Sequence, residues 1–334
     1  MATQVTTLKE RSMLAMPECK IFDHGLTIGP NGAVRPCCAF RSDQSLYWED
    51  DWQTEHHKLS KQSETEWLPG CIECKTGEDL GKSSLRTYYN EILNDTPGIQ
   101  YWDLKVNNTC NLACRMCGPW SSSRWERFAT EPGLHSNYKN ILTDRWHKTS
   151  KEFVSRMRNT TVLKFTGGEP YLIPQIRQIL KLLITEGSAK NMRLEITTNG
   201  TAVMEMWSKF FVKFKSVHIG VSIDGVGDRY EYIRPGAKWK QVSTNVERFN
   251  ALKPDNCKIS ISCLPQLLNK DNLQEVIDWA TSIGVECHMA TPIIYPKFMQ
   301  TTAWTDPDLK SEFIEQMTIL DKLHKTNWRD FINE

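Results

Sequence analysis

The sequence of 334 residues lacks an excess of charge of either sign and lacks long apolar runs. Its 41 Lys and Arg balance 40 Asp and Glu, which gives a formal net charge of +1. Because no overall field attracts nucleic acid or an anionic membrane, neither is expected as a partner. The apolar runs fall well short of the roughly 18 residues that a transmembrane helix needs. The opening residues MATQVTTLKERSM lack the apolar core of a secretory signal, so a cytoplasmic protein is expected.

Internal repeats and low-complexity tracts are also lacking, whereas cysteine is unusually frequent. The chain has 11 cysteines, an odd number, and several of them stand at CxxC or CxxxC spacing. In a chain without a secretory signal, this pattern favours metal ligation over disulfides. Three others, Cys257, Cys263 and Cys287, fall on predicted strands and are interpreted as small core residues.

Short apolar runs alternate with helix-period segments through most of the chain. The candidate strands are residues 101–106, 161–166, 192–197, 217–222, 257–263 and 284–289. Six units of strand followed by helix predict an α/β fold with a parallel sheet and right-handed crossovers, here a partial (β/α)6 barrel of the TIM type. We assign this barrel to residues 96–300, with a C-terminal helical segment over 301–334. In such barrels, functional residues lie in the loops that follow the strands.

The stretch CNLACRMC directly follows the first predicted strand and carries Cys110, Cys114 and Cys117. Structural zinc requires four ligands, and this loop has no nearby histidine to complete the set. A cubane iron–sulfur cluster also has four iron corners, which are normally all held by thiolates. Three cysteines therefore leave one iron free to bind a chelating small molecule.

Other short motifs lie at the ends of the next predicted strands. FTGGEP (165–170) has two glycines that allow close backbone approach to a ligand, and Glu169 adds a negative charge. The alternative interpretation is a strand-to-helix turn in which Pro170 helps to start the helix. TTNGT (197–201) and VSIDG (221–225) follow, and Asn199 with Gly200 is also a common turn dipeptide.

With these motifs in this order, the chain resembles the radical S-adenosylmethionine (SAM) enzymes over roughly residues 101–300. The resemblance implies that Cys110, Cys114 and Cys117 hold a [4Fe-4S] cluster whose open iron is chelated by the amino and carboxylate groups of SAM. In that family, an electron from the reduced cluster breaks a carbon–sulfur bond of SAM. The products are methionine and a 5′-deoxyadenosyl radical that abstracts hydrogen. An external donor similar to flavodoxin or ferredoxin is therefore expected.

The resemblance also implies roles for residues on several strand ends. The GGE motif of the family meets the SAM ammonium, a polar side chain after the fourth strand meets the ribose, and an arginine can fork onto the SAM carboxylate. The residue before the third cysteine is usually aromatic, and the methionine found here can still pack against adenine. For Arg234, the alternative is an ordinary surface arginine. The expected SAM-binding residues are Met116, Gly167, Gly168, Glu169, Pro170, Asn199, Ser222 and Arg234. No catalytic acid or base is recognised.

A second set of cysteines precedes the barrel. Its pattern is C19-x12-G32-x4-C37-C38, then a gap, then C71-x2-C74. Four separated thiolates can fill every corner of a second [4Fe-4S] cluster, and a zinc knuckle has the same ligand count. The pattern resembles the twitch domain of SPASM-type radical SAM enzymes, which implies one auxiliary cluster held by Cys19, Cys37, Cys71 and Cys74. Cys38 is a spare thiol that can replace Cys37. Residues 1–95 are therefore interpreted as a twitch-like module with a linker helix, although such modules generally follow the barrel.

The sequence as a whole predicts a radical SAM enzyme with two [4Fe-4S] clusters. The expected substrate is a peptide or protein side chain that is oxidised or cross-linked, and a small molecule such as a sugar or nucleoside is the alternative. The auxiliary cluster would either accept an electron from the substrate or stabilise the fold of the module. A hypothesis of another class is a non-enzymatic, zinc-stabilised binding protein.

Overall fold

The computed structural model describes residues 18–42, 46–48, 50–128 and 150–332. Part of the expected twitch-like module, residues 1–17, lies outside these ranges. The chain divides into two compact units. The unit called here the N-terminal unit comprises residues up to 28, 32–103 and 159–161, and the barrel unit comprises 29–31, 104–158 and residues from 162 onward.

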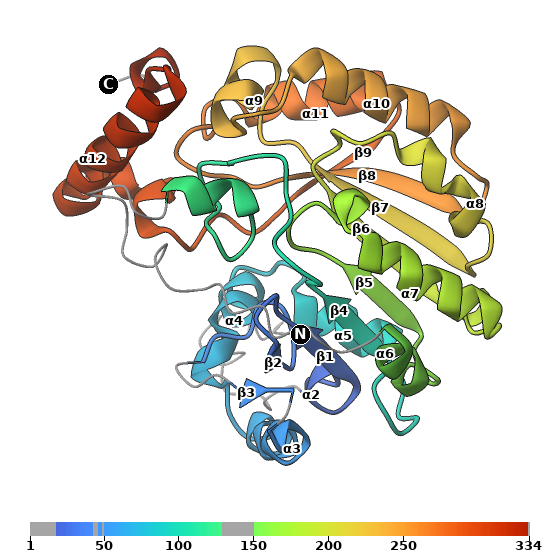
Figure 1. Cartoon of the computed structure of the whole chain (residues 1–334). Helices are drawn as coiled ribbons and strands as arrows, with labels where there is room; N and C mark the ends of the chain where they lie inside the picture. The colour runs from blue at the N-terminus through green and yellow to red at the C-terminus, as the bar shows by residue number, and fades with distance from the viewer. Residues whose placement is uncertain (1–17, 43–45, 49, 129–149, 333–334) are drawn as a thin grey trace, which may run out of the picture. The chain divides into compact units, whose positions relative to one another are not determined.

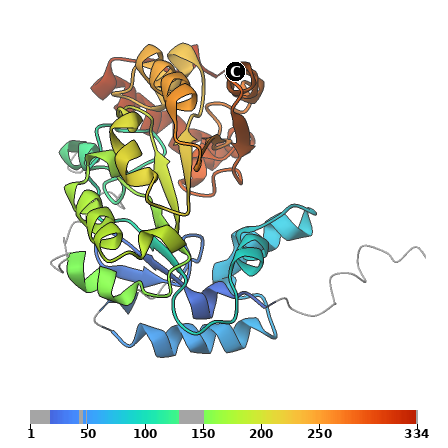
Figure 2. The same cartoon turned by 90° about the vertical axis from the view of Figure 1, so that its right-hand side faces the viewer.

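The described part of the barrel unit is built on parallel strands. They are β5 (Val162–Phe165), β6 (Arg193–Thr198), β7 (Ser216–Ser222), β8 (Cys257–Cys263) and β9 (Glu286–Met289), in that order across the sheet. Helices α7 (Pro174–Thr185), α8 (Ser208–Phe211), α10 (Trp239–Leu252) and α11 (Leu273–Ser282) connect them along one side of the sheet (Figures 1 and 2). The expected α/β architecture is therefore confirmed, and each strand lies within two residues of a predicted run.

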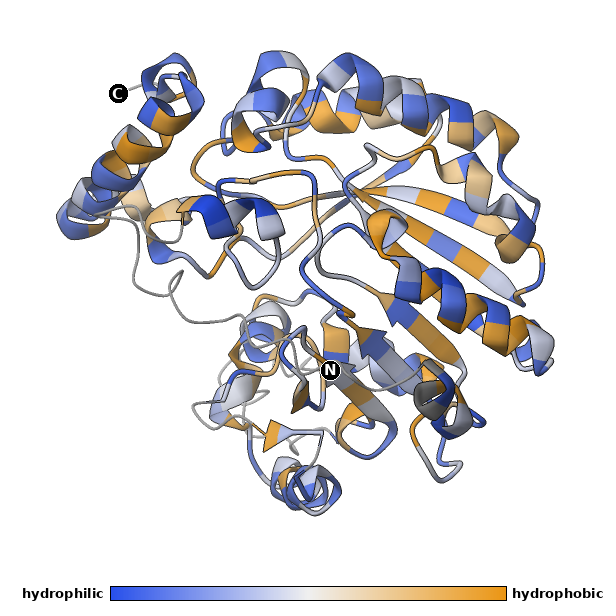
Figure 3. Ribbon diagram, in the orientation of Figure 1, coloured by the Kyte–Doolittle hydropathy of each residue, from blue (hydrophilic) through white to orange (hydrophobic). Residues whose placement is uncertain are grey.

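Buried apolar residues alternate with half-buried small or polar residues along the strands, so one face of the sheet belongs to the core and the other faces the site. In β7, Val217, Ile219 and Val221 are buried, whereas the residues between them are half-buried and small or polar. Figure 3 shows this alternation as bands of colour along β7 and β8. The apolar face packs under the helices, because successive side chains of a strand point to opposite faces. The other face carries Ser222 opposite Ser262 at the carboxyl ends of the strands.

Three further helices and several short turns complete the described part of the barrel unit. Helix α6 (Ser150–Arg156) precedes β5, and α9 (Gly227–Ile233) follows β7. The C-terminal segment expected to be helical contains α12 (Pro307–His324), flanked by short 3-10 turns at Ala303–Thr305 and Trp328–Asp330. Asp306 caps α12 by accepting the backbone N–H groups of Asp308 and Leu309, and Lys325 ends it in a left-handed conformation. None of the helices in the described ranges combines the length and apolar character needed to cross a membrane.

In its described residues, the N-terminal unit pairs short antiparallel strands with the helices α2 to α5. Strands β1 (Gly25–Ile28), β2 (Ala33–Arg35) and β3 (Leu46–Tyr47) pair in sequence, and β4 (Tyr101–Leu104), which ends at the unit boundary, lies beside β1. The helices are α2 (Ile21–His24), α3 (Trp52–Ser63), α4 (Ile72–Asp79) and α5 (Leu85–Ile92). Aromatic contacts fill its core, including Trp48 stacked on Trp52 and Tyr89 edge-on to Tyr101.

Candidate active site

The carboxyl ends of the barrel strands and the cysteine loop enclose a cavity of about 350 Å³. The structure brings most of the predicted site residues to its wall, namely Cys110, Cys114, Met116, Cys117, Gly167, Gly168, Asn199, Ser222 and Arg234. Glu169 and Pro170 are buried beside it but do not line it. Residues far apart in the sequence thus meet at one place, as the rule for parallel strands predicts.

Backbone pairing holds the cysteine loop in place. The N–H groups of Ala113 and Arg115 donate to the carbonyls of Pro235 and Ile233, each at 3.0 Å, so the loop runs alongside the segment after α9. The N–H of Cys117 donates to the carbonyl of Cys114 at 2.9 Å, which closes a tight turn between two of the cysteines. The loop is therefore fixed by main-chain bonds on both sides of Cys114.

The environment of the three sulfurs suits anionic ligands of a metal cluster. Burial raises the pKa of Cys110 to about 11, so a thiolate there needs a nearby positive charge. Hydrogen-bond donors approach the sulfurs: Leu112 N lies 3.5 Å and Asn199 Nδ2 3.8 Å from Cys110 Sγ, and Arg234 Nη1 lies 3.7 Å from Cys114 Sγ. Such donors stabilise cluster-bound thiolates, so the residues fit a cluster at this cavity.

Arg234 forms a buried ion pair with Asp224 at the cavity wall. Its Nε and Nη2 donate to the same Asp224 oxygen at 3.0 and 2.6 Å, and the other oxygen accepts Leu264 N at 2.9 Å. One edge of the guanidinium is thus directed to Asp224, and Nη1 faces the sulfur of Cys114. Arg234 is not a surface arginine; its contact with the SAM carboxylate stays a prediction.

Glu169 is fully buried and binds the loop after β6. Its carboxylate accepts Thr198 Oγ1 at 2.7 Å, Asn199 N at 2.8 Å and Tyr171 N at 3.2 Å. Burial raises its pKa to about 7 despite these three donors. Both oxygens are engaged by the protein, so Glu169 orients Asn199 toward Cys110. Its predicted contact with SAM stays a prediction.

The two glycines of the GGE motif allow two loops to pack against each other. Gly167 and Gly168 have φ angles of 71° and 56°, in the left-handed region that favours glycine. A Cβ on Gly168 would lie 2.4 Å from the carbonyl oxygen of Thr109, directly before Cys110. The next residue, Glu169, donates its N–H to that same carbonyl at 2.7 Å. Gly168 is therefore required for contact with the cysteine loop, whereas a Cβ on Gly167 would lie 3.0 Å from the side chain of Lys105.

The sequence interpretation missed several residues of the wall. They are Leu112, Ser121, Ser122, Thr197, Ser262, Leu264 and Ala290. Ser262 could have been found, because it occupies the inward position of β8 that pairs with Ser222. Ser121 and Ser122 carried no local signal, since only the fold of the loop after Cys117 brings them back to the cavity.

The four cysteines predicted as auxiliary ligands line one small cavity in the N-terminal unit. Cys19, Cys37, Cys71 and Cys74 share this cavity with mostly apolar neighbours and Arg86. Burial raises the pKa of Cys19 to about 12 and that of Cys71 to about 11. Cys38 is not part of the wall, and its sulfur lies 3.9 Å from Tyr89 Oη. Thiols brought together in this way fit a thiolate-bound metal centre.

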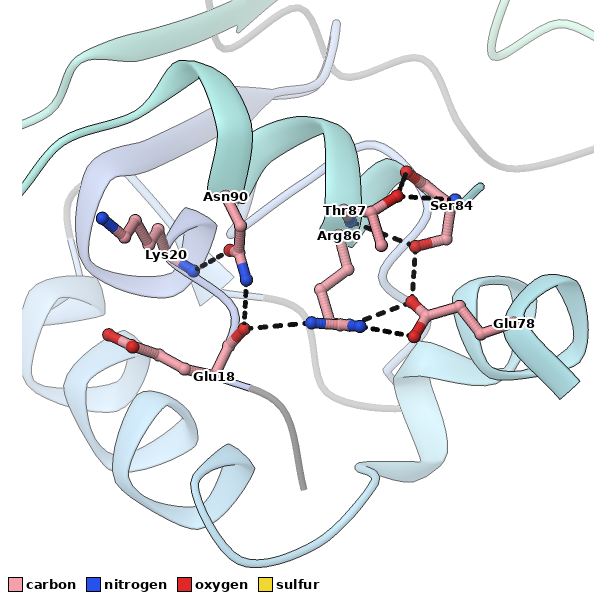
Figure 4. Close-up of polar contacts among 7 residues, drawn as sticks. All are labelled: Glu18, Lys20, Glu78, Ser84, Arg86, Thr87 and Asn90. Carbon is pink, nitrogen blue, oxygen red and sulfur yellow. Dashed lines mark hydrogen bonds and ion pairs between the residues drawn. The ribbon is translucent and has the colours of Figure 1, made fainter. Parts of the chain in front are cut away.

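A hydrogen-bond network joins the segments that carry Cys19 and Cys74 (Figure 4). Arg86 on α5 binds both carboxylate oxygens of Glu78, four residues after Cys74, and reaches the carbonyl of Glu18 at 3.4 Å. Asn90 Nδ2 donates to that carbonyl at 2.5 Å, and Asn90 Oδ1 accepts Lys20 N at 2.9 Å. The residues on both sides of Cys19 are therefore bound to α5, and α5 is bound to α4.

Among the described residues, no three His, Cys, Asp or Glu side chains lie close enough to bind one metal ion between them. A four-iron cluster binds each thiolate at a different iron. Its cysteines therefore stand further apart than the ligands of a single ion.

Comparisons with known proteins place this site in a family. A family model described as the radical SAM superfamily matches residues 104–280. Molybdenum cofactor biosynthesis protein 1 of Dictyostelium discoideum is 29% identical over 184 residues, which are 54% of this chain and 26% of that protein. A cysteine-type anaerobic sulfatase-maturating enzyme of Clostridium novyi (strain NT) is 26% identical over 156 residues, 44% of this chain and 39% of the relative. The chain thus spans less than two thirds of these curated relatives. The crystal structure of Streptococcus suis SuiB bound to S-adenosylmethionine has 13% identity and a TM-score of 0.43, covering 82% of this chain and 55% of that one.

Proposed function

Because the chain belongs to the radical SAM superfamily, we propose that it binds a [4Fe-4S] cluster and SAM at the barrel cavity and abstracts hydrogen from a substrate. The observation that supports this most is the meeting of Cys110, Cys114 and Cys117 at one cavity with the other predicted SAM-binding residues. When bound, the reduced cluster supplies the electron that cleaves SAM to methionine and a 5′-deoxyadenosyl radical. An external protein donor similar to flavodoxin or ferredoxin provides that electron.

The chain's own residues hold and tune this centre. Cys110, Cys114 and Cys117 would hold the cluster, and the side chains of Asn199 and Arg234 donate hydrogen bonds to the sulfurs of Cys110 and Cys114. Such bonds lower the electron density on sulfur and raise the reduction potential of a cluster. The inward hydroxyls of Ser222 and Ser262 and the Met116 side chain are available to the nucleoside of SAM.

The N-terminal unit is proposed to bind an auxiliary [4Fe-4S] cluster through Cys19, Cys37, Cys71 and Cys74. Their common cavity and the side-chain network around Arg86 support this ligand set. With all four corners held by protein, this cluster would take up an electron from the substrate radical or would serve as a staple. A zinc ion at the same cysteines is the alternative.

For the substrate, we propose a peptide or protein side chain. The sulfatase-maturating relative is named for an action on a protein, which favours this class. The relative named for molybdenum cofactor biosynthesis supports the second candidate, a small molecule such as a sugar or nucleoside. Incubation with SAM and a reductant, with mass spectrometry of candidate peptides and nucleosides, decides between them.

Replacing Cys114 tests the reaction at its first step. In Cys114→Ala, we expect anaerobically reduced protein to form no 5′-deoxyadenosine from SAM, because one corner of the cluster loses its ligand. Cys287→Ala is the matched control, since Cys287 lies on β9 outside the cavity wall. Equal yields from Cys114→Ala and the wild type would remove the cysteine loop from the mechanism.

Metal content separates the enzyme from the zinc-stabilised binding protein. Protein purified without oxygen should be brown and should contain about eight irons per chain if two four-iron clusters are bound. Colourless protein that contains zinc instead would favour the binding protein and would contradict the proposal.

A further inference from the structure

Arg115 lies inside the cysteine loop, between Cys114 and Met116, yet it does not line the cavity. Its side chain is fully buried and points to the C-terminal helix α12. A buried guanidinium carries a large desolvation cost unless its donors and its charge are matched. Such a residue beside a proposed cluster ligand therefore needs a specific partner.

Arg115 finds its partners on two segments. Nε donates to the carbonyl of Tyr232 at 2.8 Å, and the guanidinium carbon lies 3.9 Å from the centroid of the Tyr232 ring. Nη2 donates to Asp321 Oδ1 at 2.8 Å and to Thr326 Oγ1 at 2.7 Å. The hydroxyl of Thr326 lies 2.7 Å from the same Asp321 oxygen. The charge of Arg115 is therefore neutralised from α12 and the turn that follows it.

The position of Asp321 is unfavourable for α12 alone. Asp321 stands in the last turn of the helix, where the helix dipole disfavours a negative charge. It is nevertheless buried, with 7% of its surface exposed, and its second oxygen accepts Trp328 N at 2.5 Å. The positive charge of Arg115, whose Nη2 lies 2.8 Å from Asp321 Oδ1, offsets both the burial of the carboxylate and its unfavourable position in the helix. The presence of a carboxylate at this position is thus better explained by its ion pair with the cysteine loop than by any benefit to the helix.

Apolar packing supports the same contact. The core formed by Phe313, Met317 and Leu320 of α12 extends to Ala113, and Met116 and Cys117 pack against it. The cysteine loop is consequently held on one side by the barrel strands' loops and on the other by α12. Helix α12 lies beyond residues 104–280, which the family model matches.

We propose that Asp321, acting through Arg115, is a positioning residue for the barrel cluster. Its contact fixes the backbone between Cys114 and Cys117 and so sets the spacing of two cluster ligands. The inference rests on the proposed cluster at this loop. It adds that the C-terminal helix is part of the machinery that presents the open iron to SAM.

The test compares three changes with a control on the same helix. Asp321→Asn keeps the size of the side chain but leaves the charge of Arg115 unmatched. Arg115→Met combined with Asp321→Leu removes both charges and keeps an apolar fill. Thr326→Val removes the hydrogen bonds of one hydroxyl to Arg115 and Asp321 at an exposed residue and leaves the ion pair in place. Glu315→Gln, on the exposed face of α12, is the control.

The readouts are cluster retention against an iron chelator, the thermal midpoint, and the change that SAM induces in the electron paramagnetic resonance spectrum of the reduced protein. Asp321→Asn should lose iron from the barrel site roughly tenfold faster, because supporting contacts of metal ligands have effects of that size. The charge-free pair should recover the thermal midpoint but keep an altered response to SAM. If the contact were purely structural, the charge-free pair would recover both the thermal midpoint and the wild-type response to SAM.

Wild-type retention and a wild-type SAM response in Asp321→Asn or in the charge-free pair would overturn the proposal. If Asp321→Asn does not fold, Thr326→Val decides, since it should change retention in the same direction by a smaller factor, and no change would count against the inference. A wild-type protein without any SAM-induced spectral change would instead refute the proposed function.

Discussion

At the scale of single residues, the site depends on a few positions that no other amino acid can fill. Gly168 is one of them, because its backbone lies against Thr109 at the entrance to the cysteine loop. Its conformation, with φ of 56°, and its lack of a side chain are both needed there. Gly187 has a similar φ of 75°, but a Cβ added to it would have open space for at least 4 Å around it. A comparison of alanine substitutions at the two glycines therefore separates the cost of a left-handed backbone conformation from the cost of a steric clash.

We expect Gly168→Ala to be clearly more destabilising than Gly187→Ala. The second change costs about 1–2 kcal/mol for the left-handed conformation of alanine. The first adds a contact of 2.4 Å with Thr109 O that requires one of the loops to move. Urea unfolding measures the difference, and iron content reports whether the cysteine loop has shifted. Equal losses of stability in the two variants would contradict the packing argument.

The sequence predicted residues whose chemistry is visible locally. The three cysteines at fixed spacing and the paired glycines belong to this class. Contact of Glu169 with SAM stays a prediction, and the structure adds that its carboxylate accepts hydrogen bonds from Thr198 and Asn199. These partners are about thirty positions away in the sequence, so no local pattern could reveal them. The pairing of Arg234 with Asp224, ten positions apart, likewise depends on how the segment after β7 folds.

At the scale of elements, helix α3 shows how a buried face can include a titrating group. Its buried residues are Trp52, His56, Ser60 and Ser63, which recur at helical spacing, and Asp51 caps its first turn. His56 is 2% exposed, and neither ring nitrogen has a hydrogen-bond partner among the described residues. Burial lowers its pKa to about 4. The adjacent His57 has a side chain that is 64% exposed.

Stability should therefore fall as the pH is lowered through the titration range of His56. Below pH 6.5 the unfolded chain binds a proton that the folded chain binds only near pH 4, so folding loses up to about 3 kcal/mol across this window. His56→Leu should remove this part of the pH dependence, and His57→Leu should leave it unchanged. Urea midpoints measured at several pH values give the comparison. A wild-type slope in His56→Leu would show that the histidine is not the group responsible.

Strands and helices with a clear period were predicted well, and short elements were not. The strand predicted over residues 257–263 coincides with β8, because apolar residues alternate along it. Strands β1, β2 and β3 have two to four residues each, which is too short for any period to be read. Their pairing depends on contacts between segments that the sequence does not place together.

At the scale of the whole molecule, the two cysteine sets fall in two separate compact units. All four N-terminal cysteines line a cavity of one unit, and all three loop cysteines line a cavity of the other. The sequence predicts a module boundary between residues 95 and 96, and the two compact units of the structure divide between Asp103 and Leu104. The strand β4 lies at this boundary, and its sequence alone does not show with which of the two units it packs.

Loss of one cluster should consequently leave the other in place. We expect Cys71→Ala with Cys74→Ala to lower the iron content from about eight to about four per chain, if both sites hold four-iron clusters. The SAM-induced spectral change should persist, because it belongs to the barrel unit. Iron analysis and electron paramagnetic resonance measure the two outcomes.

Cys38→Ala is the matched control for this experiment, since its sulfur lies near Tyr89 and outside the cavity wall. It should keep the full iron content. Unchanged iron in the double variant would refute the auxiliary site, and a loss in Cys38→Ala would make Cys38 a ligand.

The bonds that Arg86 makes with Glu78 and with the carbonyl of Glu18 run between protein atoms alone. They hold together two stretches of chain that are separated by more than fifty residues, and so fix the relative positions of two cysteines, Cys19 and Cys74, that are proposed to bind the auxiliary cluster.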